Sequence, residues 1–197
     1  MNFTNRLKGS VTQVLLKSLL EDAGYRIVPL GIEAVLREVA ALPKEEYLKL
    51  GLPIQLRKLP DFFVSNHDID KTWLVEVKYR KKWNDEVQTR LEEEIKEQVK
   101  TWNPLYLMIF LGHSAEEPHS SPIYHMRIAK LLWDDKEGIL TQRQDGQTCI
   151  WKNSQWKHFL RVQDVFDECA TKEKWEEQTI EKTKELAIKL KELDLFV

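Results

Sequence analysis

The sequence contains little cysteine, glycine or proline, and it has no long apolar run. Cysteine occurs only at Cys149 and Cys169, and glycine and proline occur seven times each in 197 residues. Two cysteines fit a reducing compartment and exclude a disulfide framework or a cysteine-only zinc site. The scarcity of glycine and proline excludes disordered and collagen-like chains. The longest apolar run, residues 105–111, falls well short of the ~20 residues that span a bilayer. Because the first ten residues also lack an apolar core, we expect a soluble, cytoplasmic protein with no membrane partner.

The composition is that of a single folded domain, residues 1–197. Hydrophobic residues make up 42% of the chain and charged residues 31%, and a chain of this length can bury a sizeable core. The net charge is only −2, but it is unevenly placed. Residues 1–20 hold three basic residues and no acidic one, and residues 57–82 hold seven basic residues against four acidic ones. This separation suits one basic face toward a phosphate backbone, although ordinary scatter of charge is the simpler explanation.

The apolar patterning predicts an α/β fold with a mixed central sheet flanked by helices. The predicted elements of the first part are a helix over 9–23, a strand over 25–32, a helical insertion over 33–56, strands over 61–65 and 72–80, a helix over 85–102 and a buried strand over 105–111. Residues 112–197 are predicted to form a C-terminal extension, with short strands over 123–132 and 149–158 and a charged helix over 172–194.

The two strands over 61–65 and 72–80 bring three charged residues together. Side chains alternate between the faces of a strand, so Glu76 and Lys78 share one face. If the hairpin is symmetric about the bond between residues 68 and 69, Asp61 lies directly opposite Glu76. Opposed Cβ atoms are ~5 Å apart, and two like charges there destabilise the sheet. A divalent cation between the carboxylates would remove this repulsion, and Mg²⁺ prefers such oxygen ligands. A solvent-facing hairpin with alternating charges is the competing interpretation.

Pro60-Asp61 followed by Glu76-Val77-Lys78 resembles the motif of the PD-(D/E)xK nuclease superfamily. This superfamily has the restriction-endonuclease-like fold and includes archaeal Holliday-junction resolvases. The predicted order of helix, three-stranded meander, helix and strand matches that fold. The first helix also resembles the resolvase entry helix, including the spacing from Gly9 to Gly24. The resemblance covers roughly residues 8–111.

The resemblance implies roles for the motif residues. Asp61 and Glu76 would bind Mg²⁺, or Mn²⁺ in its place, with help from the carbonyl group of Val77. Lys78 would position or activate the attacking water and stabilise developing charge. Resolvase-like members carry a glutamate four residues after the first glycine, where this chain has Gln13.

Other residues are weaker candidates for the site. Glu33 is a candidate substitute for the missing carboxylate, although an acid at a helix start is the more common role of such a residue. Gln98, on the helix after the motif, matches a site-facing glutamine of some superfamily members, and an ordinary glutamine on a helix surface is the alternative. The candidate contacts to nucleic-acid phosphates are Lys8, Arg80, Lys81 and Lys82.

The sequence therefore predicts a Mg²⁺-dependent nuclease that hydrolyses phosphodiester bonds in DNA. A homodimer is a further expectation, because cleaving a duplex needs two cuts. One alternative is a nuclease-fold module that binds DNA or a protein partner without cutting, and Gln13 is the residue that favours it. Another is an interaction protein in which the hairpin is purely structural. The residues do not distinguish DNA from RNA, since none of them marks recognition of a 2′-hydroxyl group.

Overall fold

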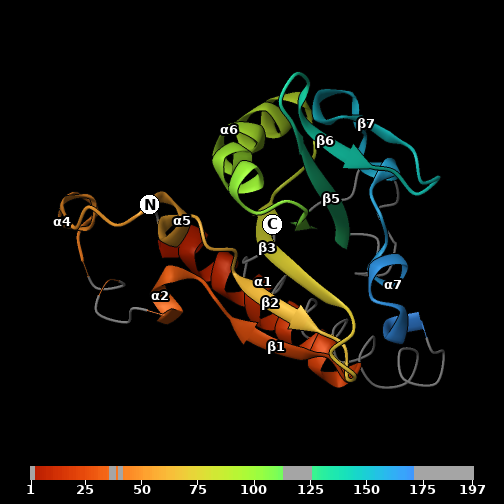
Figure 1. Ribbon diagram of the computed structural model, residues 1–197, viewed down its shortest axis with the longest axis horizontal. Coiled ribbons are helices and arrows are strands. Elements are labelled where there is room, and N and C mark those ends of the chain that lie inside the picture. The colour runs from red at the N-terminus through yellow and green to blue at the C-terminus, as the bar shows by residue number, and fades with distance from the viewer. Residues whose placement is uncertain (1–2, 36–38, 40–41, 113–125, 171–197) are drawn as a thin grey trace.

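A single seven-stranded sheet organises the molecule (Figure 1). The computed structural model describes residues 3–35, 39, 42–112 and 126–170. The strands lie side by side in chain order: β1 Arg26–Pro29, β2 Phe62–Ser65, β3 Thr72–Arg80, β4 Leu105–Leu111, β5 Met126–Asp134, β6 Gly138–Gln142 and β7 Thr148–Ile150. Strands β3 and β4 are parallel, and every other neighbouring pair is antiparallel. The predicted α/β class with a mixed sheet is confirmed.

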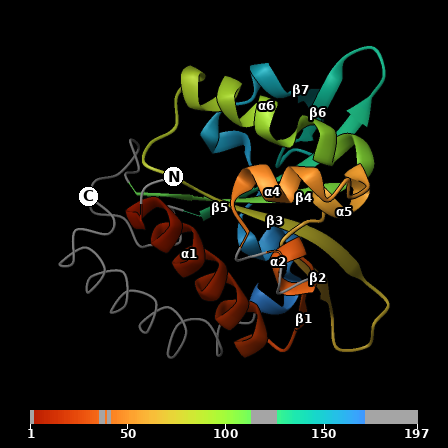
Figure 2. The ribbon, with the colours of Figure 1, turned by 90° about the vertical axis from the view of Figure 1, so that its left-hand side faces the viewer.

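Two long helices lie on opposite faces of the sheet: α1 (Phe3–Asp22) and α6 (Asp85–Thr101) (Figure 2). On the α1 face, Leu16 and Leu20 pack with the side chains of β3 that point toward them. On the α6 face, Leu91 and Ile95 pack against β4 and β5. Each face therefore has its own buried apolar cluster, and the sheet separates the two.

The connection between the parallel strands depends on the ends of α6. Parallel neighbours need a long crossover, and α6 provides it between β3 and β4. The side chain of Asn84 caps the helix by accepting a hydrogen bond from the backbone N–H of Val87 at 2.9 Å, as its position predicts. Thr101 is the last helical residue, in agreement with the stop expected at Asn103-Pro104.

The register of the predicted hairpin is confirmed. Phe62 pairs with Val75 and Ser65 pairs with Thr72, which is the symmetric arrangement expected from the sequence. The pairing ends there, so Asp61 lies just before β2 and, contrary to the prediction, is not paired with Glu76. The left-handed φ of 60° at Ile69 places the turn at the predicted midpoint.

The segment between β1 and β2 is helical, as expected, but its bounds differ from the prediction. Strand β1 ends at Pro29 rather than at residue 32, because the backbone N–H groups of Leu30 and Gly31 turn to the carbonyl of Asp61. The insertion contains α2 (Ile32–Val35), α4 (Lys44–Lys49) and α5 (Ile54–Arg57). Residues 36–38 and 40–41 of the predicted first insertion helix lie outside the described residues.

The C-terminal extension differs more from the prediction. Strands β5, β6 and β7 continue the central sheet, and the hairpin between β5 and β6 was not predicted. The predicted strand over residues 149–158 is wrong: β7 ends at Ile150, and two 3-10 turns follow, η2 (Trp151–Asn153) and η3 (Trp156–His158). These turns bury both tryptophans in the cluster beneath α6, which a straight strand with alternating faces would not do.

After η3 the chain crosses to the other face of the sheet. Helices α7 (Val162–Val165) and η4 (Asp167–Ala170) bring Phe166 into the cluster on the α1 face. The charged helix predicted over residues 172–194 lies outside the described residues.

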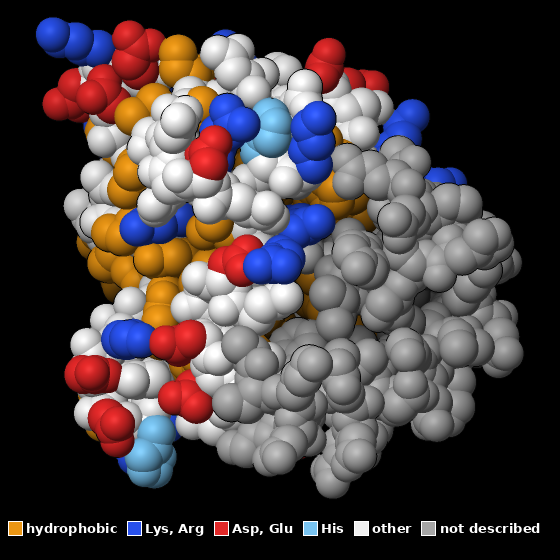
Figure 3. Space-filling view, turned by 90° about the vertical axis from the view of Figure 1, so that its right-hand side faces the viewer, with side chains coloured by type: hydrophobic (Ala, Val, Ile, Leu, Met, Phe, Trp, Pro, Cys, Tyr) orange, Lys and Arg blue, Asp and Glu red, His pale blue; other side chains and the backbone are white. Residues whose placement is uncertain are grey.

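The described surface carries charges of both signs. Figure 3 shows one side of the molecule, where Lys and Arg side chains lie beside Asp and Glu side chains, with hydrophobic side chains between them. Among the described residues, no helix is both long and apolar enough to cross a membrane.

Candidate functional site

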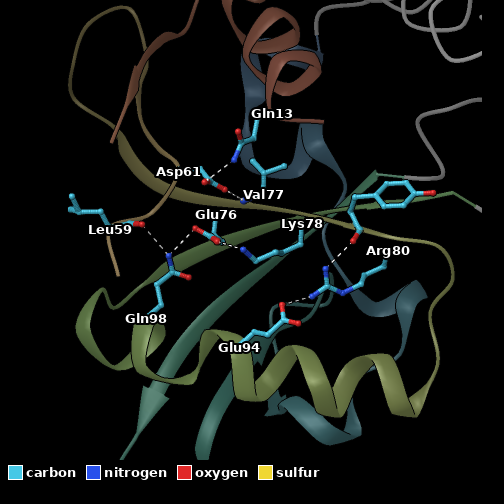
Figure 4. Close-up of polar contacts among 10 residues, drawn as sticks. Gln13, Leu59, Asp61, Glu76, Val77, Lys78, Arg80, Glu94 and Gln98 are labelled. Carbon is cyan, nitrogen blue, oxygen red and sulfur yellow. Dashed lines mark hydrogen bonds and ion pairs between the residues drawn. The ribbon is translucent and has the colours of Figure 1, made fainter. Parts of the chain in front are cut away.

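The predicted site lies where one edge of β3 is left open. Strand β2 pairs with β3 only from Thr72 to Val75, whereas β4 pairs with β3 from Val75 to Arg80. No described strand pairs with the other edge of residues 76–80. The backbone groups on this edge are thus available to side chains from other elements, and the motif residues meet there (Figure 4).

Asp61 is fixed from two directions. Gln13, on α1, donates a hydrogen bond through Nε2 to Oδ1 of Asp61 at 2.8 Å. The backbone N–H of Val77, on the open edge of β3, donates to Oδ2 of the same carboxylate at 2.8 Å. The backbone of Asp61 is tied to the end of β1, because Leu30 N–H donates to its carbonyl at 2.9 Å. The carboxylate is therefore positioned by α1, β1 and β3 together.

Glu76 is held by two other candidate site residues, Lys78 and Gln98. The Lys78 ammonium group donates a hydrogen bond to Oε1 of Glu76 and forms an ion pair with it. Gln98 Nε2, reaching from α6, donates to Oε2 at 2.7 Å (Figure 4). The side chain of Glu76 is only 8% exposed and that of Lys78 is 27% exposed, so the carboxylate is buried and its lysine is partly exposed.

The three charges influence one another. Burial raises the pKa of Asp61 to about 7, and repulsion from Glu76 adds to this effect. The Lys78 charge and the two hydrogen bonds from Val77 and Gln13 act in the opposite direction. Burial alone would lower the pKa of the Lys78 ammonium group, but the charges of Glu76 and Asp61 outweigh it, and that pKa is raised. Two carboxylates held this close leave the site short of positive charge.

The carboxylate oxygens of Asp61 and Glu76 suit a divalent cation that prefers oxygen ligands. Each of the four carboxylate oxygens of Asp61 and Glu76 accepts one hydrogen bond from the protein. A carboxylate oxygen has a further lone-pair site, so each can still bind a cation. The described residues contain no group of three or more His, Cys, Asp or Glu that could hold a metal. Mg²⁺ is commonly bound by one or two carboxylates, with water and substrate phosphate as its other ligands, so Asp61 and Glu76 fit this ion.

The structure also places the four residues that were predicted to contact nucleic-acid phosphates. Lys8 lies over the ring of Tyr79, with its ammonium group 5.3 Å from the ring centre. Arg80 is not free to meet phosphates, since it donates to Glu94 at 2.5 Å and to the carbonyl of Tyr79 at 2.8 Å. Both Lys81 and Lys82 are exposed at the end of β3.

Glu33 lies in α2, which begins directly after Gly31. The backbone N–H of Gly31 donates to the carbonyl of Asp61, and the side chain of Glu33 lies outside the described residues. Whether it supplies a carboxylate to the site stays a prediction.

Gln98 was only a weak candidate from the sequence, and its contact with Leu59 was not predicted. Gln98 is 5% exposed, so the alternative of an ordinary surface glutamine is wrong. Its place in the chain gives a signal, because it lies seven residues after Leu91 and three after Ile95, on the buried stripe of α6. The contact of Gln98 Nε2 with the carbonyl of Leu59, at 3.4 Å, has no sequence signal, since any residue supplies a carbonyl.

Comparisons of the chain with family models, curated proteins and solved structures found no significant match.

Proposed function

We propose that this chain is a metal-dependent nuclease that hydrolyses DNA phosphodiester bonds. The observation that carries the proposal is the convergence of Asp61, Glu76 and Lys78 at the open edge of β3. Asp61 is held from α1 and β3, Glu76 is held from α6, and Lys78 is paired with Glu76 on its own strand. The element order α1, β1, β2, β3, α6, β4 is also the order that the resemblance to PD-(D/E)xK nucleases implies. Asp61 and Glu76 would hold Mg²⁺, with the Val77 carbonyl as an additional ligand.

The residues around the cation would each have a chemical task. Mg²⁺, when bound, supplies a Lewis acid that neutralises charge on the phosphate group. Lys78 is the cation that lies beside the two carboxylates and is partly exposed, so it would orient the attacking water and stabilise negative charge that develops on the phosphate. Gln98 and Gln13 would keep Glu76 and Asp61 in place, since each donates to one oxygen of the carboxylate.

A second candidate function is a nuclease-fold module that binds DNA or a protein partner without cutting. The specific observation in its favour is the contact between Gln13 and Asp61. A neutral amide stands here where the resolvase-like pattern has a glutamate, so the site has one negative charge fewer with which to hold a cation.

The test is metal-dependent cleavage of a DNA panel: supercoiled plasmid, linear duplex, single strand and four-way junction. Each substrate is incubated with Mg²⁺, with Mn²⁺ and with chelator. The protein is compared with Asp61→Ala and Lys78→Ala, and with Asp68→Ala and Lys136→Ala as matched controls, whose residues are exposed and lie away from the site. We expect cleavage that stops in chelator and falls at least about 100-fold in both site variants, with both controls fully active.

Full activity of Lys78→Ala would sink the catalytic assignment. If the wild-type protein cuts nothing, Mn²⁺ calorimetry separates the two candidates, because an inactive module should bind no metal at this pair. A Gln13→Glu variant that gains metal binding would then identify Gln13 as the cause of inactivity.

A further inference from the structure

The insertion contains a stretch of chain that combines positive charge with exposed apolar side chains. Residues 47–60 contain three basic residues, Lys49, Arg57 and Lys58, and no acidic one, in a chain with 32 Asp and Glu residues. Four apolar side chains of this stretch are strongly exposed: Leu48 at 51%, Leu50 at 47%, Ile54 at 37% and Leu56 at 38%. We call residues 47–58 the insertion segment. Glu45 and Glu46 lie in the first turn of α4, on the same helix as Lys49, so the unopposed positive charge of the segment is that of Arg57 and Lys58. Four exposed aliphatic side chains this close together in the chain are more than a scatter of single apolar groups.

The insertion segment is joined directly to the site. Its last residue precedes Leu59, whose carbonyl accepts a hydrogen bond from Gln98 Nε2. The same nitrogen donates to Glu76, so one amide group links the end of the segment to a proposed metal ligand (Figure 4). Figure 2 shows α4 and α5 beside the ends of the strands, between α1 and α6. A molecule that reaches the site from this side meets the insertion segment first.

Other charges near the site are less suited to attract a polyanion. Helix α6 carries six acidic residues against three basic ones. Arg80 is paired with Glu94, and Lys78 is paired with Glu76. By contrast, neither Arg57 nor Lys58 forms an ion pair within the described part of the chain.

We infer that the insertion segment binds nucleic acid in which bases next to the cut are unpaired. Arg57 and Lys58 contact the phosphates, and Ile54 and Leu56 pack against the faces of unstacked bases. Aliphatic side chains serve as such wedges between base steps of duplex DNA, and the cost of unstacking a base is lowest where it is already unpaired. This inference rests on the proposed function, and it names the substrate class of that site.

The experiment measures binding in chelator, so that it does not depend on cleavage. The probes are a perfect DNA duplex and the same duplex with a three-base bulge that contains 2-aminopurine. The variants are Ile54→Ser with Leu56→Ser, and Arg57→Gln with Lys58→Gln. The matched controls are Val28→Ser, an even more exposed apolar residue on the edge strand, and Lys136→Gln, an exposed cation in the turn between β5 and β6. All of these side chains are surface residues, and thermal unfolding verifies that each variant is folded.

We expect the apolar pair to lower affinity for the bulged probe about 10-fold, to abolish the 2-aminopurine signal and to leave duplex binding unchanged. The basic pair should weaken binding to both probes and lower the salt dependence by about two phosphate contacts. Neither control should change binding. Unchanged affinity of both double variants for the bulged probe overturns the inference. Binding to anionic phospholipid vesicles is measured in parallel. The inference is also overturned if the double variants lose only this vesicle binding, because the segment would then be a membrane contact.

The outcomes also separate this inference from the proposed function. A protein that cuts DNA equally well with both double variants retains the nuclease assignment and loses the inference. A protein that binds the bulged probe through the segment but never cuts DNA retains the inference and loses the nuclease assignment.

Discussion

The carboxyl group of Asp61 makes the stability of the metal-free protein depend on pH. Burial, together with repulsion from Glu76, raises its pKa from 3.8 to about 7. Between these two values the folded state keeps a proton that the unfolded state releases, so the free energy of unfolding falls as pH rises from about 4 to about 7. Thermal unfolding in chelator at pH 5 and pH 8 should show this loss in the wild-type protein. Asp61→Asn, which carries no titratable group at this position, should be much less sensitive to pH, and parallel curves for the two proteins would contradict the assignment.

Gln98 connects α6 to two other parts of the site. It donates to Glu76 and to the carbonyl of Leu59, and it is buried. Gln98→Ala would leave both oxygens without this donor, and we expect it to lower the free energy of unfolding by about 1–3 kcal/mol. Urea unfolding measures the effect. Glu93→Ala, an exposed position on the same helix, should change stability by less than about 0.5 kcal/mol, and an equal effect at both positions would reduce Gln98 to a generic helix residue.

At the scale of elements, α6 carries Gln98 to the site, and the cap at Asn84 fixes where this helix begins. The Asn84 side chain satisfies the N–H of Val87, which no residue within the helix can do. Asn84→Ala should therefore destabilise the protein by about 0.5–2 kcal/mol, and Asn84→Asp should retain nearly full stability. Urea unfolding of the three proteins tests this expectation. If the aspartate variant is as unstable as the alanine variant, the side chain has a role other than capping.

The elements that could be predicted are those whose signals are local. The turn between Asn66 and Lys71 and the alternation on either side specify the register of β2 and β3, because a slip of one residue would move every side chain of a strand to the opposite face of the sheet. The tertiary fit of Trp151 and Trp156 could not be predicted. A tryptophan favours a strand by propensity, and only the buried space beneath α6 explains why the chain turns there instead.

The candidate site likewise has a part that could be predicted from the sequence and a part that could not. Asp61, Glu76 and Lys78 could be placed together from strand geometry alone. That Gln13 and Gln98 close on them from opposite faces depends on how α1 and α6 pack on the sheet, which no local pattern records. For the same reason the pairing of Arg80 with Glu94 was not foreseen, and Arg57 and Lys58 of the insertion segment were counted only as part of the basic stretch over residues 57–82.

At the scale of the whole molecule, the site is the point where α1, β1, β2, β3 and α6 are tied together. Asp61 holds α1 and β1 against β3, and Glu76 holds α6. A cation that bridges the two carboxylates would therefore connect both layers on either side of the sheet. Its binding energy would oppose the separation of these layers, which is part of global unfolding.

This arrangement predicts that Mn²⁺ raises the melting temperature of the wild-type protein. At 100 times its Kd a ligand adds about 2.7 kcal/mol to the free energy of unfolding, and each kcal/mol is worth about 2–4 °C for a domain of this size. Asp61→Asn should lose most of this increase, because it removes one of the two charged ligands. Asp68→Asn, an exposed residue in the turn between β2 and β3, should keep all of it. The melting temperatures are measured by calorimetry at pH 8, where the Asp61 carboxyl group, with its pKa of about 7, is mostly ionised. An equal increase in both variants would mean that Mn²⁺ binds elsewhere, and the metal assignment of Asp61 and Glu76 would then be wrong.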